Sequence, residues 1–139
     1  MVIYDTNVVS ELMRTKPYER VQQFLRRFES ATSFITATTV QELWYGVLAV
    51  KDSEKKARLE ASLVTMLVSQ FRGRVLDFDS KAAKVSAELL LVQLSRGHQI
   101  QHWDTQIAAI AITSNFTLLT RNTKDFNYPG LQLSNPWTD

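Results

Sequence analysis

The sequence predicts a single α/β domain built around a parallel β-sheet. Short runs of β-branched and aromatic residues alternate along the chain with longer segments whose apolar residues recur at helical spacing. Helices that follow strands in this way are the crossover connections that a parallel sheet requires. A chain of 139 residues fits one such domain, so we expect the domain to span residues 1–139.

The first half of the chain predicts two strands and four helices. The run Val2-Ile3-Tyr4 is apolar throughout, as expected of a strand covered by helices on both faces. After Pro17, apolar residues at 21, 24, 25 and 28 follow the spacing of an amphipathic helix. The expected elements are a strand at 2–4, helices at 8–13 and 18–28, a strand at 32–36, a helix from Thr38 or Thr39 to 50, and a helix from a cap at Asp52 or Ser53 to about 71.

The second half predicts three more strands and two helices. Gly97 is a typical helix end, and the segment from Trp103 onward is rich in alanine and isoleucine, which indicates a buried helix. The expected elements are a strand at 75–78, a helix capped by Asp79 or Ser80 that runs to 94, a helix at 103–114, a strand at 116–120 and an edge strand at 131–133.

The composition excludes several classes of protein. Hydrophobic residues make up 45% of the chain and charged residues 22%, which is typical of a globular domain rather than a disordered one. The absence of cysteine excludes disulfides and thiolate zinc sites and favours a cytoplasmic location. No apolar run is long enough to span a bilayer and no signal peptide opens the sequence, so we expect no membrane partner. A net charge of +2 and a pI near 9 are compatible with a polyanionic ligand.

Four polar residues have similar positions relative to the predicted strands. Asp5 follows the first strand and Asn122 follows the fourth, while Glu42 lies one turn into the helix after the second strand. Asp104 begins the buried helix that precedes the fourth strand. Because the carboxyl ends of parallel strands meet at one edge of the sheet, we expect these side chains to lie near one another.

Each of the four also has a purely structural interpretation. Asp5 is a favourable N-cap, and Glu42 stands three residues after Thr39, the spacing of a capping box. Asp104 at a helix start is favoured by the helix macrodipole, and Asn122 is a typical turn residue. For any one residue alone, the structural interpretation is the stronger.

Their combined placement favours a metal site. Three carboxylates in one pocket repel one another and have raised pKa values unless a positive charge lies between them. Ligands that are all oxygen atoms suit Mg²⁺ or Mn²⁺ rather than zinc. Such ions commonly assist phosphoryl chemistry by activating a water molecule and by neutralising charge on the phosphate.

The same positions lie in segments that together resemble the PIN-domain ribonucleases. Within that family the chain resembles the VapC-type toxins of type II toxin–antitoxin pairs, and among these the FitB-like branch. The resemblance implies a three-layer α/β/α fold with a central parallel sheet of four to five strands, and a metal-dependent endoribonuclease. It is carried by residues 5–7, 39–43 with Gly46, 104–109, 120–126 and the closing Asn135-Pro136-Trp137.

The resemblance also implies roles for individual residues. Asp5, Glu42 and Asp104 are expected to be the acidic ligands of the metal. Asn122 stands where some relatives carry a fourth acid, and Asp125 is an alternative for that place. The remaining expectations are that Thr6 and Asn7 orient Asp5 or a bound water molecule, and that Arg121 holds a phosphate of the RNA.

The expected partners are a VapB-like antitoxin, an RNA such as a tRNA, and a second copy of the chain in a homodimer. The helices around residues 12–13, 24–28 and 44–48 carry more large apolar side chains than a small sheet needs, which indicates an interface unless these side chains form the core. Two alternative functions remain at this point. One is a housekeeping RNA or DNA nuclease of the same fold, and the other is a catalytically inactive binding module.

Overall fold

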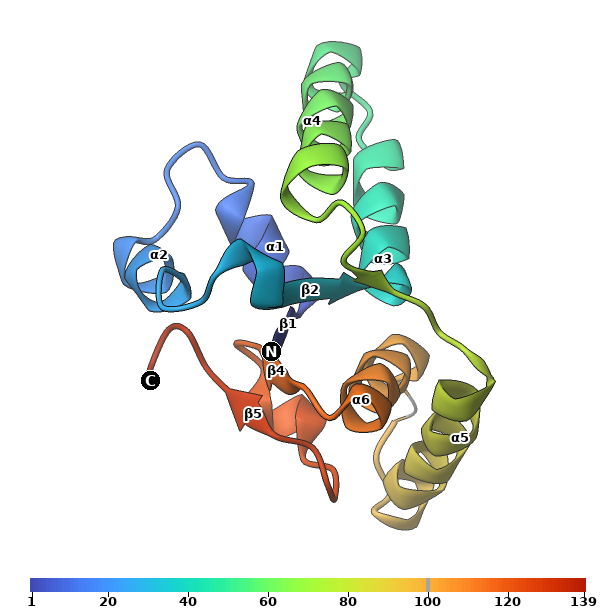
Figure 1. The fold of residues 1–139 in the computed structure, drawn as a ribbon. Coiled ribbons are helices and arrows are strands. Elements are labelled where there is room, and N and C mark those ends of the chain that lie inside the picture. Colours follow the sequence, from blue (N-terminus) through green and yellow to red (C-terminus); the bar gives the residue numbers. More distant parts are fainter. Residues whose placement is uncertain (100) are drawn as a thin grey trace.

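Five parallel strands form the central sheet of the computed structural model, which describes residues 1–99 and 101–139. The strand order is β3-β2-β1-β4-β5, so β1 lies at the centre (Figure 1). Val2 of β1 pairs with Ser33 of β2 on one side and with Thr117 of β4 on the other. The strands are β1 Val2–Tyr4, β2 Ser33–Thr36, β3 Val75–Leu76, β4 Thr117–Leu119 and β5 Leu133–Ser134. The predicted α/β class is confirmed, with β5 at the sheet edge as expected.

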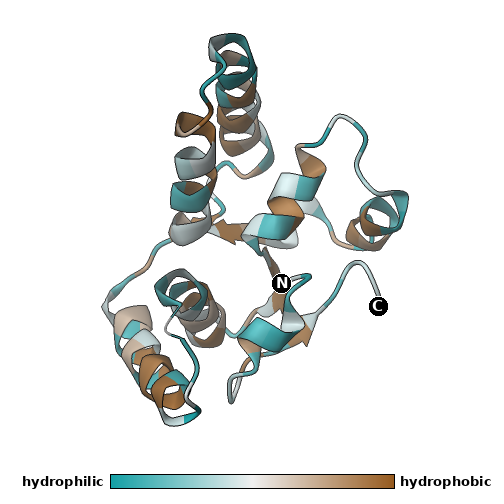
Figure 2. Ribbon diagram, turned by 180° about the vertical axis from the view of Figure 1, so that it is seen from behind, coloured by the Kyte–Doolittle hydropathy of each residue, from teal (hydrophilic) through white to brown (hydrophobic). Residues whose placement is uncertain are grey.

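Helices cover both faces of the sheet and complete three layers (Figure 1). Side chains of β1 alternate between the faces: Val2 and Tyr4 join the core beneath α1 to α4, whereas Ile3 joins the core beneath α5 and α6. The strands are accordingly among the most hydrophobic parts of the ribbon in Figure 2. The helices are α1 Thr6–Leu12, α2 Glu19–Leu25, α3 Ala37–Leu48, α4 Ser53–Thr65, α5 Ser80–Ser95 and α6 His102–Ser114, with short turns η1 Ser30–Thr32, η2 Met66–Gln70 and η3 Thr123–Phe126.

Most predicted boundaries lie within two residues of those observed. Of the predicted alternatives Asp52 or Ser53 and Asp79 or Ser80, the aspartates are the N-caps, because their carboxylates accept hydrogen bonds from the backbone N–H groups of Lys55 and Ala82. Two boundaries were wrong. The second helix ends at Leu25 instead of continuing to residue 28, and the helix predicted to run to about 71 leaves α-geometry after Thr65, where the π-helical turn η2 begins.

The predicted surplus of apolar side chains on the N-terminal helices is mostly core. Phe24, Leu25 and Val47 are buried, which contradicts their assignment to an interface. Leu12, Met13, Phe28 and Trp44 are partly buried and pack against the same core. Tyr45 and Leu48 do remain exposed, at 67% and 55% of their surface, so this part of α3 presents apolar groups to solvent.

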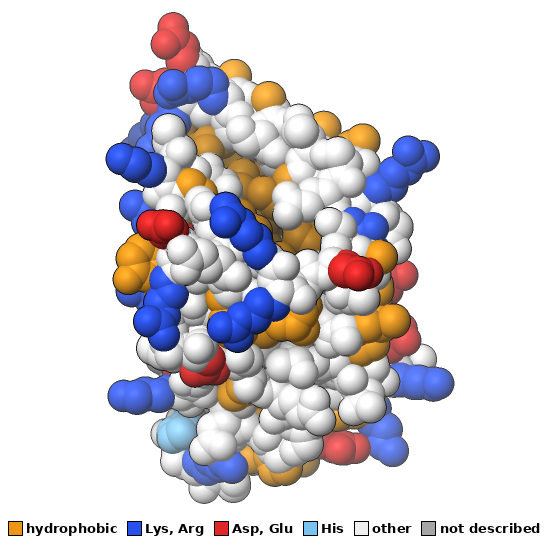
Figure 3. All heavy atoms as spheres, turned by 60° about the vertical axis from the view of Figure 1, so that its left-hand side comes forward, with side chains coloured by type: hydrophobic (Ala, Val, Ile, Leu, Met, Phe, Trp, Pro, Cys, Tyr) orange, Lys and Arg blue, Asp and Glu red, His pale blue; other side chains and the backbone are white. Residues whose placement is uncertain are grey.

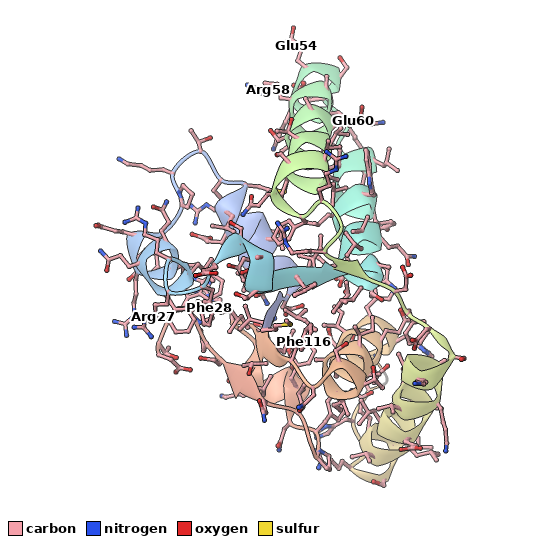
Figure 4. The ribbon with its side chains drawn as sticks, in the orientation of Figure 1. Arg27, Phe28, Glu54, Arg58, Glu60 and Phe116 are labelled. Carbon is pink, nitrogen blue, oxygen red and sulfur yellow. The ribbon has the colours of Figure 1, made fainter. Side chains whose placement is uncertain are left out.

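The surface is mixed in charge. Lys and Arg side chains gather on the face shown in Figure 3, around a hollow lined by hydrophobic side chains. On α4, Glu54, Arg58 and Glu60 project away from the sheet (Figure 4). No helix in the described part of the chain is long and apolar enough to cross a membrane.

Candidate active site

Asp5 stands at the carboxyl end of the central strand and is held by hydrogen bonds on both of its carboxylate oxygens. The backbone N–H of Thr6 donates to Oδ1 at 2.8 Å, so Asp5 is indeed the N-cap of α1. The Thr120 hydroxyl and the Asn7 amide donate to Oδ2 at 2.7 and 3.0 Å. Burial raises the pKa of Asp5, and the three hydrogen bonds oppose that rise. The capping interpretation is therefore correct and compatible with a role in the site, because one oxygen caps the helix while the other faces Thr120.

Glu42 reaches the same edge of the sheet from the second turn of α3. The Thr6 hydroxyl donates to its Oε1 at 2.9 Å and also lies 3.1 Å from the Thr39 hydroxyl. The capping box predicted between Thr39 and Glu42 was wrong: α3 begins earlier, at Ala37, and its cap is Thr36, whose hydroxyl accepts from the Thr39 backbone N–H. Glu42 is thus not needed to cap its own helix.

Asp104 lies in the first turn of α6 and is the most strongly perturbed acid of the site. Its pKa is raised to about 7, first by burial and then by repulsion from Asp5, Glu42 and Asp125. Glu42 also has a raised pKa, for which burial is the main cause and Asp5 a smaller one. The acids therefore act on one another electrostatically, as expected for a shared site.

A cavity of about 490 Å³ brings these acids together. Asp5, Glu42 and Asp104 all line it, although they come from three separate elements. The structure therefore places together the three acids that the sequence singled out. The cavity is also lined by Thr6, Asn7, Arg121 and Asn122, each of which the sequence had indicated.

Four further residues of this cavity were not assigned to the site from the sequence: Ser10, Glu11, Arg14 and Trp137. Glu11 is buried and accepts hydrogen bonds from the Tyr18 backbone and from the Arg14 guanidinium, the latter at 3.2 Å. The hydrogen bond from the Tyr18 backbone N–H is the main reason why the pKa of Glu11 is lowered. Glu11 therefore anchors Arg14 beside the acidic cavity through this ion pair.

Arg121 is held at the other side of the cavity by an aromatic ring. Its guanidinium lies 5.2 Å from the centre of the Trp137 ring, a cation–π geometry. Its backbone N–H donates to the Asn7 side chain at 3.2 Å, and its carbonyl accepts from Asn135 at 3.3 Å. The cavity thus combines carboxylates with two arginines, Arg14 and Arg121.

Asn122 and Asp125 have different places. Asn122 lines the acidic cavity and precedes η3, where its carbonyl accepts from the Asp125 backbone N–H at 3.0 Å. Asp125 lies inside η3 and lines a neighbouring cavity instead. Its carboxylate still raises the pKa values of Asp5 and Asp104.

The oxygen ligands of the acidic cavity are of the chemical type that binds a hard divalent cation. The acidic cavity offers carboxylate, amide and hydroxyl oxygens, which suit Mg²⁺ or Mn²⁺. Within residues 1–99 and 101–139, no three acidic or imidazole groups converge tightly enough to form a ready-made metal cluster. Asp5 and Glu42 are fixed by hydrogen bonds. Asp104 has a pKa raised first by burial and then by repulsion from the other acids, and a cation would relieve that repulsion. Of the three, Asp104 has the most to gain from a bound cation.

Comparison with known proteins gives a consistent result. Residues 2–129 match the PIN domain family. The chain is 34% identical over 139 residues to the toxin FitB of Neisseria gonorrhoeae, and the match covers all of both chains. It is 35% identical over 137 residues to the plasmid stability protein StbB of Pseudomonas syringae pv. tomato, and 33% identical over 137 residues to a VapC ribonuclease of Sinorhizobium fredii; these matches cover 98% or more of each chain.

Solved structures show the same likeness in three dimensions. The crystal structure of FitAcB from Neisseria gonorrhoeae superposes on this chain with a TM-score of 0.90 and 34% identity, covering 100% of both chains. A structure of FitAB bound to a DNA fragment gives a TM-score of 0.89 at 32% identity and covers 100% of this chain and 97% of that one.

Proposed function

This chain belongs to the PIN-domain family, and from that premise we propose that it is the toxin of a toxin–antitoxin pair, a metal-dependent endoribonuclease that hydrolyses RNA phosphodiester bonds. The observation that carries the proposal is the convergence of Asp5, Glu42 and Asp104 on one cavity whose sides also present Arg14 and Arg121. Carboxylates alone would repel RNA. The two arginines supply the attraction for its phosphates.

In the proposed mechanism Asp5, Glu42 and Asp104 hold Mg²⁺ or Mn²⁺. A bound divalent ion lowers the pKa of water and neutralises charge on the phosphate. Thr120 and Asn7 fix the Oδ2 oxygen of Asp5, so this ligand is oriented before any substrate arrives.

The cations and the polar side chains position the substrate. Arg121 stacks on Trp137 and is thereby held with its guanidinium near the acids, where it contacts a phosphate oxygen of the RNA. Arg14 contacts a phosphate oxygen from the α1 side of the cavity, where its ion pair with Glu11 anchors it. Asn122 contributes a neutral oxygen where some members of the family carry an acid. The metal-free site therefore has one negative charge fewer than in a family member that carries an acid at this position.

We further propose that an antitoxin covers this site in a cytoplasmic complex. A groove of about 630 Å³ between α1, α3 and α4 opens beside Glu42 and is lined by Met13, Leu43, Val47 and Leu59. A short amphipathic segment would place its apolar side chains there. An arginine or lysine of that segment could then enter the acidic cavity and pair with Asp5 or Asp104. The exposed Tyr45, which packs edge-on against Trp103 at 6.0 Å, lies on the surface that we assign to a homodimer.

The nuclease proposal is tested by RNA cleavage with purified protein, with Mg²⁺ and with EDTA. We expect cleavage only with the metal, and at least a 100-fold loss for Asp5→Asn and Glu42→Gln, because each removes a ligand charge while keeping side-chain size. The matched control is Asp77→Asn, which changes an exposed aspartate outside the cavity. Circular dichroism should show that all three variants are folded.

Two results would contradict the proposal. Cleavage by Asp5→Asn at the wild-type rate would remove Asp5 from the site, and undiminished cleavage in EDTA would remove the metal. Growth arrest on expression of the chain alone, relieved by its genomic neighbour, tests the toxin assignment separately. RNA cleavage without growth arrest would favour a housekeeping nuclease.

A further inference from the structure

A second cavity, of about 580 Å³, shares Asp104 with the acidic cavity. It lies among the C-terminal end of α5, the start of α6 and η3, and Asp104 is the residue that lines both cavities. Its volume is in the range of pockets that bind small organic groups. A group bound here therefore lies next to a candidate catalytic acid.

The floor of this second cavity is a buried polar pair. Gln93 is only 6% exposed, and its amide nitrogen donates to the Tyr128 hydroxyl. Its amide oxygen accepts from the backbone N–H of Gln101 at 3.3 Å. Because the Tyr128 oxygen accepts from Gln93, the proton of its own hydroxyl is left for an acceptor on a ligand. Burial is the main reason why the pKa of Tyr128 is raised to about 12, so the phenol keeps that proton.

The rim of the cavity carries charges of both signs. Arg96 and Lys124 are exposed cations that line it, and Arg96 is held in place by a hydrogen bond of 2.6 Å to the Asn127 carbonyl. The carboxylates of Asp104 and Asp125 lie in its wall. These acids repel a phosphate from the interior, while the cations attract one at the rim.

This distribution suits a nucleotide better than a simple anion. A nucleobase is uncharged and presents both donors and acceptors along its edge, which match the Asp125 carboxylate and the Tyr128 hydroxyl. Bases of single-stranded RNA are accessible for such recognition, whereas paired bases are not. The flanking phosphate would remain outside, near Arg96 and Lys124.

We propose that this cavity binds an unpaired nucleotide of the RNA, adjacent to the phosphate that is cut, with its base against Tyr128 and Asp125 and its phosphate at Arg96 and Lys124. The identification of the ligand as RNA rests on the nuclease function proposed above. The cavity would then make this protein select its cleavage site by a base in a single-stranded segment.

Binding of short RNAs to the Asp5→Asn protein tests the proposal without cleavage. The probes are fluorescein-labelled 8-mers of A, of C and of U, and an abasic ribose-phosphate 8-mer. Replacing both rim cations, Arg96→Gln with Lys124→Gln, should weaken binding of all four probes about tenfold at low salt. It should also reduce the slope of log affinity against log salt by about 1.4, since each phosphate contact in a single strand contributes about 0.7. The control Lys81→Gln, an exposed lysine at the start of α5, should change neither quantity.

The Tyr128→Phe variant tests the base contact, because it keeps the ring and removes the hydroxyl. We expect about fivefold weaker binding of the base-bearing probe that binds best, reduced discrimination among A, C and U, and unchanged binding of the abasic probe. An unchanged melting temperature, within about 2 °C, would show that the floor is still packed. If the melting temperature falls further, Asp125→Asn measures the same contact from an exposed position.

The outcomes separate the two proposals. Wild-type-like binding by the Arg96/Lys124 double variant, or equal losses for base-bearing and abasic probes in Tyr128→Phe, would overturn the nucleotide cavity even if the protein cuts RNA. The expected binding pattern in a protein that cuts no RNA with Mg²⁺ would support the cavity and contradict the nuclease proposal.

Discussion

Replacing Asp104 by Asn should stabilise the metal-free protein at neutral pH while abolishing its proposed activity. Burial and repulsion from Asp5 and Glu42 raise the pKa of Asp104 from 3.8 to about 7. The folded protein therefore holds a proton that the unfolded chain releases between about pH 4 and pH 7. Across that interval the contribution of Asp104 to the free energy of unfolding falls as pH rises, and above pH 7 the full penalty is present.

The magnitude follows from the shift of the Asp104 pKa. Three pH units correspond to about 4 kcal/mol. Because this carboxyl is partly open to solvent, which screens the repulsion, we take about half, or about 2 kcal/mol. The N-terminal end of α6 favours a negative charge by about 0.5 kcal/mol, which reduces the gain for Asp104→Asn to about 1.5 kcal/mol. For a chain of this size that is a rise in melting temperature of about 5 °C at pH 8.

Thermal unfolding in EDTA at pH 4 and pH 8 measures the effect. At pH 4 the wild type and Asp104→Asn should unfold within about 1 °C of each other, since the Asp104 carboxyl is protonated in the folded protein. With Mg²⁺ at pH 8 the difference in melting temperature between Asp104→Asn and the wild type should shrink or reverse. The ion stabilises the wild-type protein, which keeps the Asp104 ligand, more than the variant. The matched control is Asp77→Asn, which changes an exposed aspartate outside the cavity. Equal melting temperatures for Asp104→Asn and wild type at pH 8, or the same gain at both pH values, would refute the assignment of a repelled, partly buried acid.

Three further predictions concern the supports of the site. Thr120→Val removes the 2.7 Å hydrogen bond to Asp5 and should lower kcat for RNA cleavage by 10- to 100-fold with a smaller change in KM; an unchanged kcat would mean that Asp5 needs no such support. Asn122→Asp adds a charge to the acidic cavity and should tighten Mn²⁺ binding in calorimetry, whereas weaker or equal binding would place residue 122 outside the metal shell. Trp137→Ala removes the ring under Arg121 and should raise KM about threefold to tenfold, while kcat stays near that of the wild type; a loss confined to kcat would contradict the role in RNA binding.

Much of the fold could be predicted because its signals are local. Apolar runs such as Val2-Ile3-Tyr4 and the periodic apolar residues of the helices identify the elements without any knowledge of their packing. The acids Asp5 and Asp104 could be predicted because the ends of parallel strands, and the first turns of the helices beside them, lie at a common edge. Errors arose where several residues could serve equally well: Thr36, Thr38 and Thr39 can all cap a helix, and the hydroxyl that does so is that of Thr36.

The supports of the site could not be predicted because they depend on contacts between distant segments. Nothing near Thr120 in the sequence indicates that its hydroxyl donates to Asp5, since this contact exists only when β4 lies beside β1. Trp137 and Arg14 are likewise brought to the acidic cavity by folding. The closing Asn135-Pro136-Trp137 was part of the family resemblance, yet its sequence carries no signal that the ring would lie against Arg121.

The pairing of the first strand with β4 has a consequence for the time at which the protein becomes active during synthesis. The hydroxyl that orients Asp5 belongs to a residue 115 positions later in the chain. At ordinary rates of translation the ribosome needs about 6 to 23 s to add that many residues. During this interval the nascent chain carries its first acid but not the strand that completes the site. Until β4 is made and pairs with β1, the hydroxyl that orients Asp5 is missing and the proposed site is incomplete.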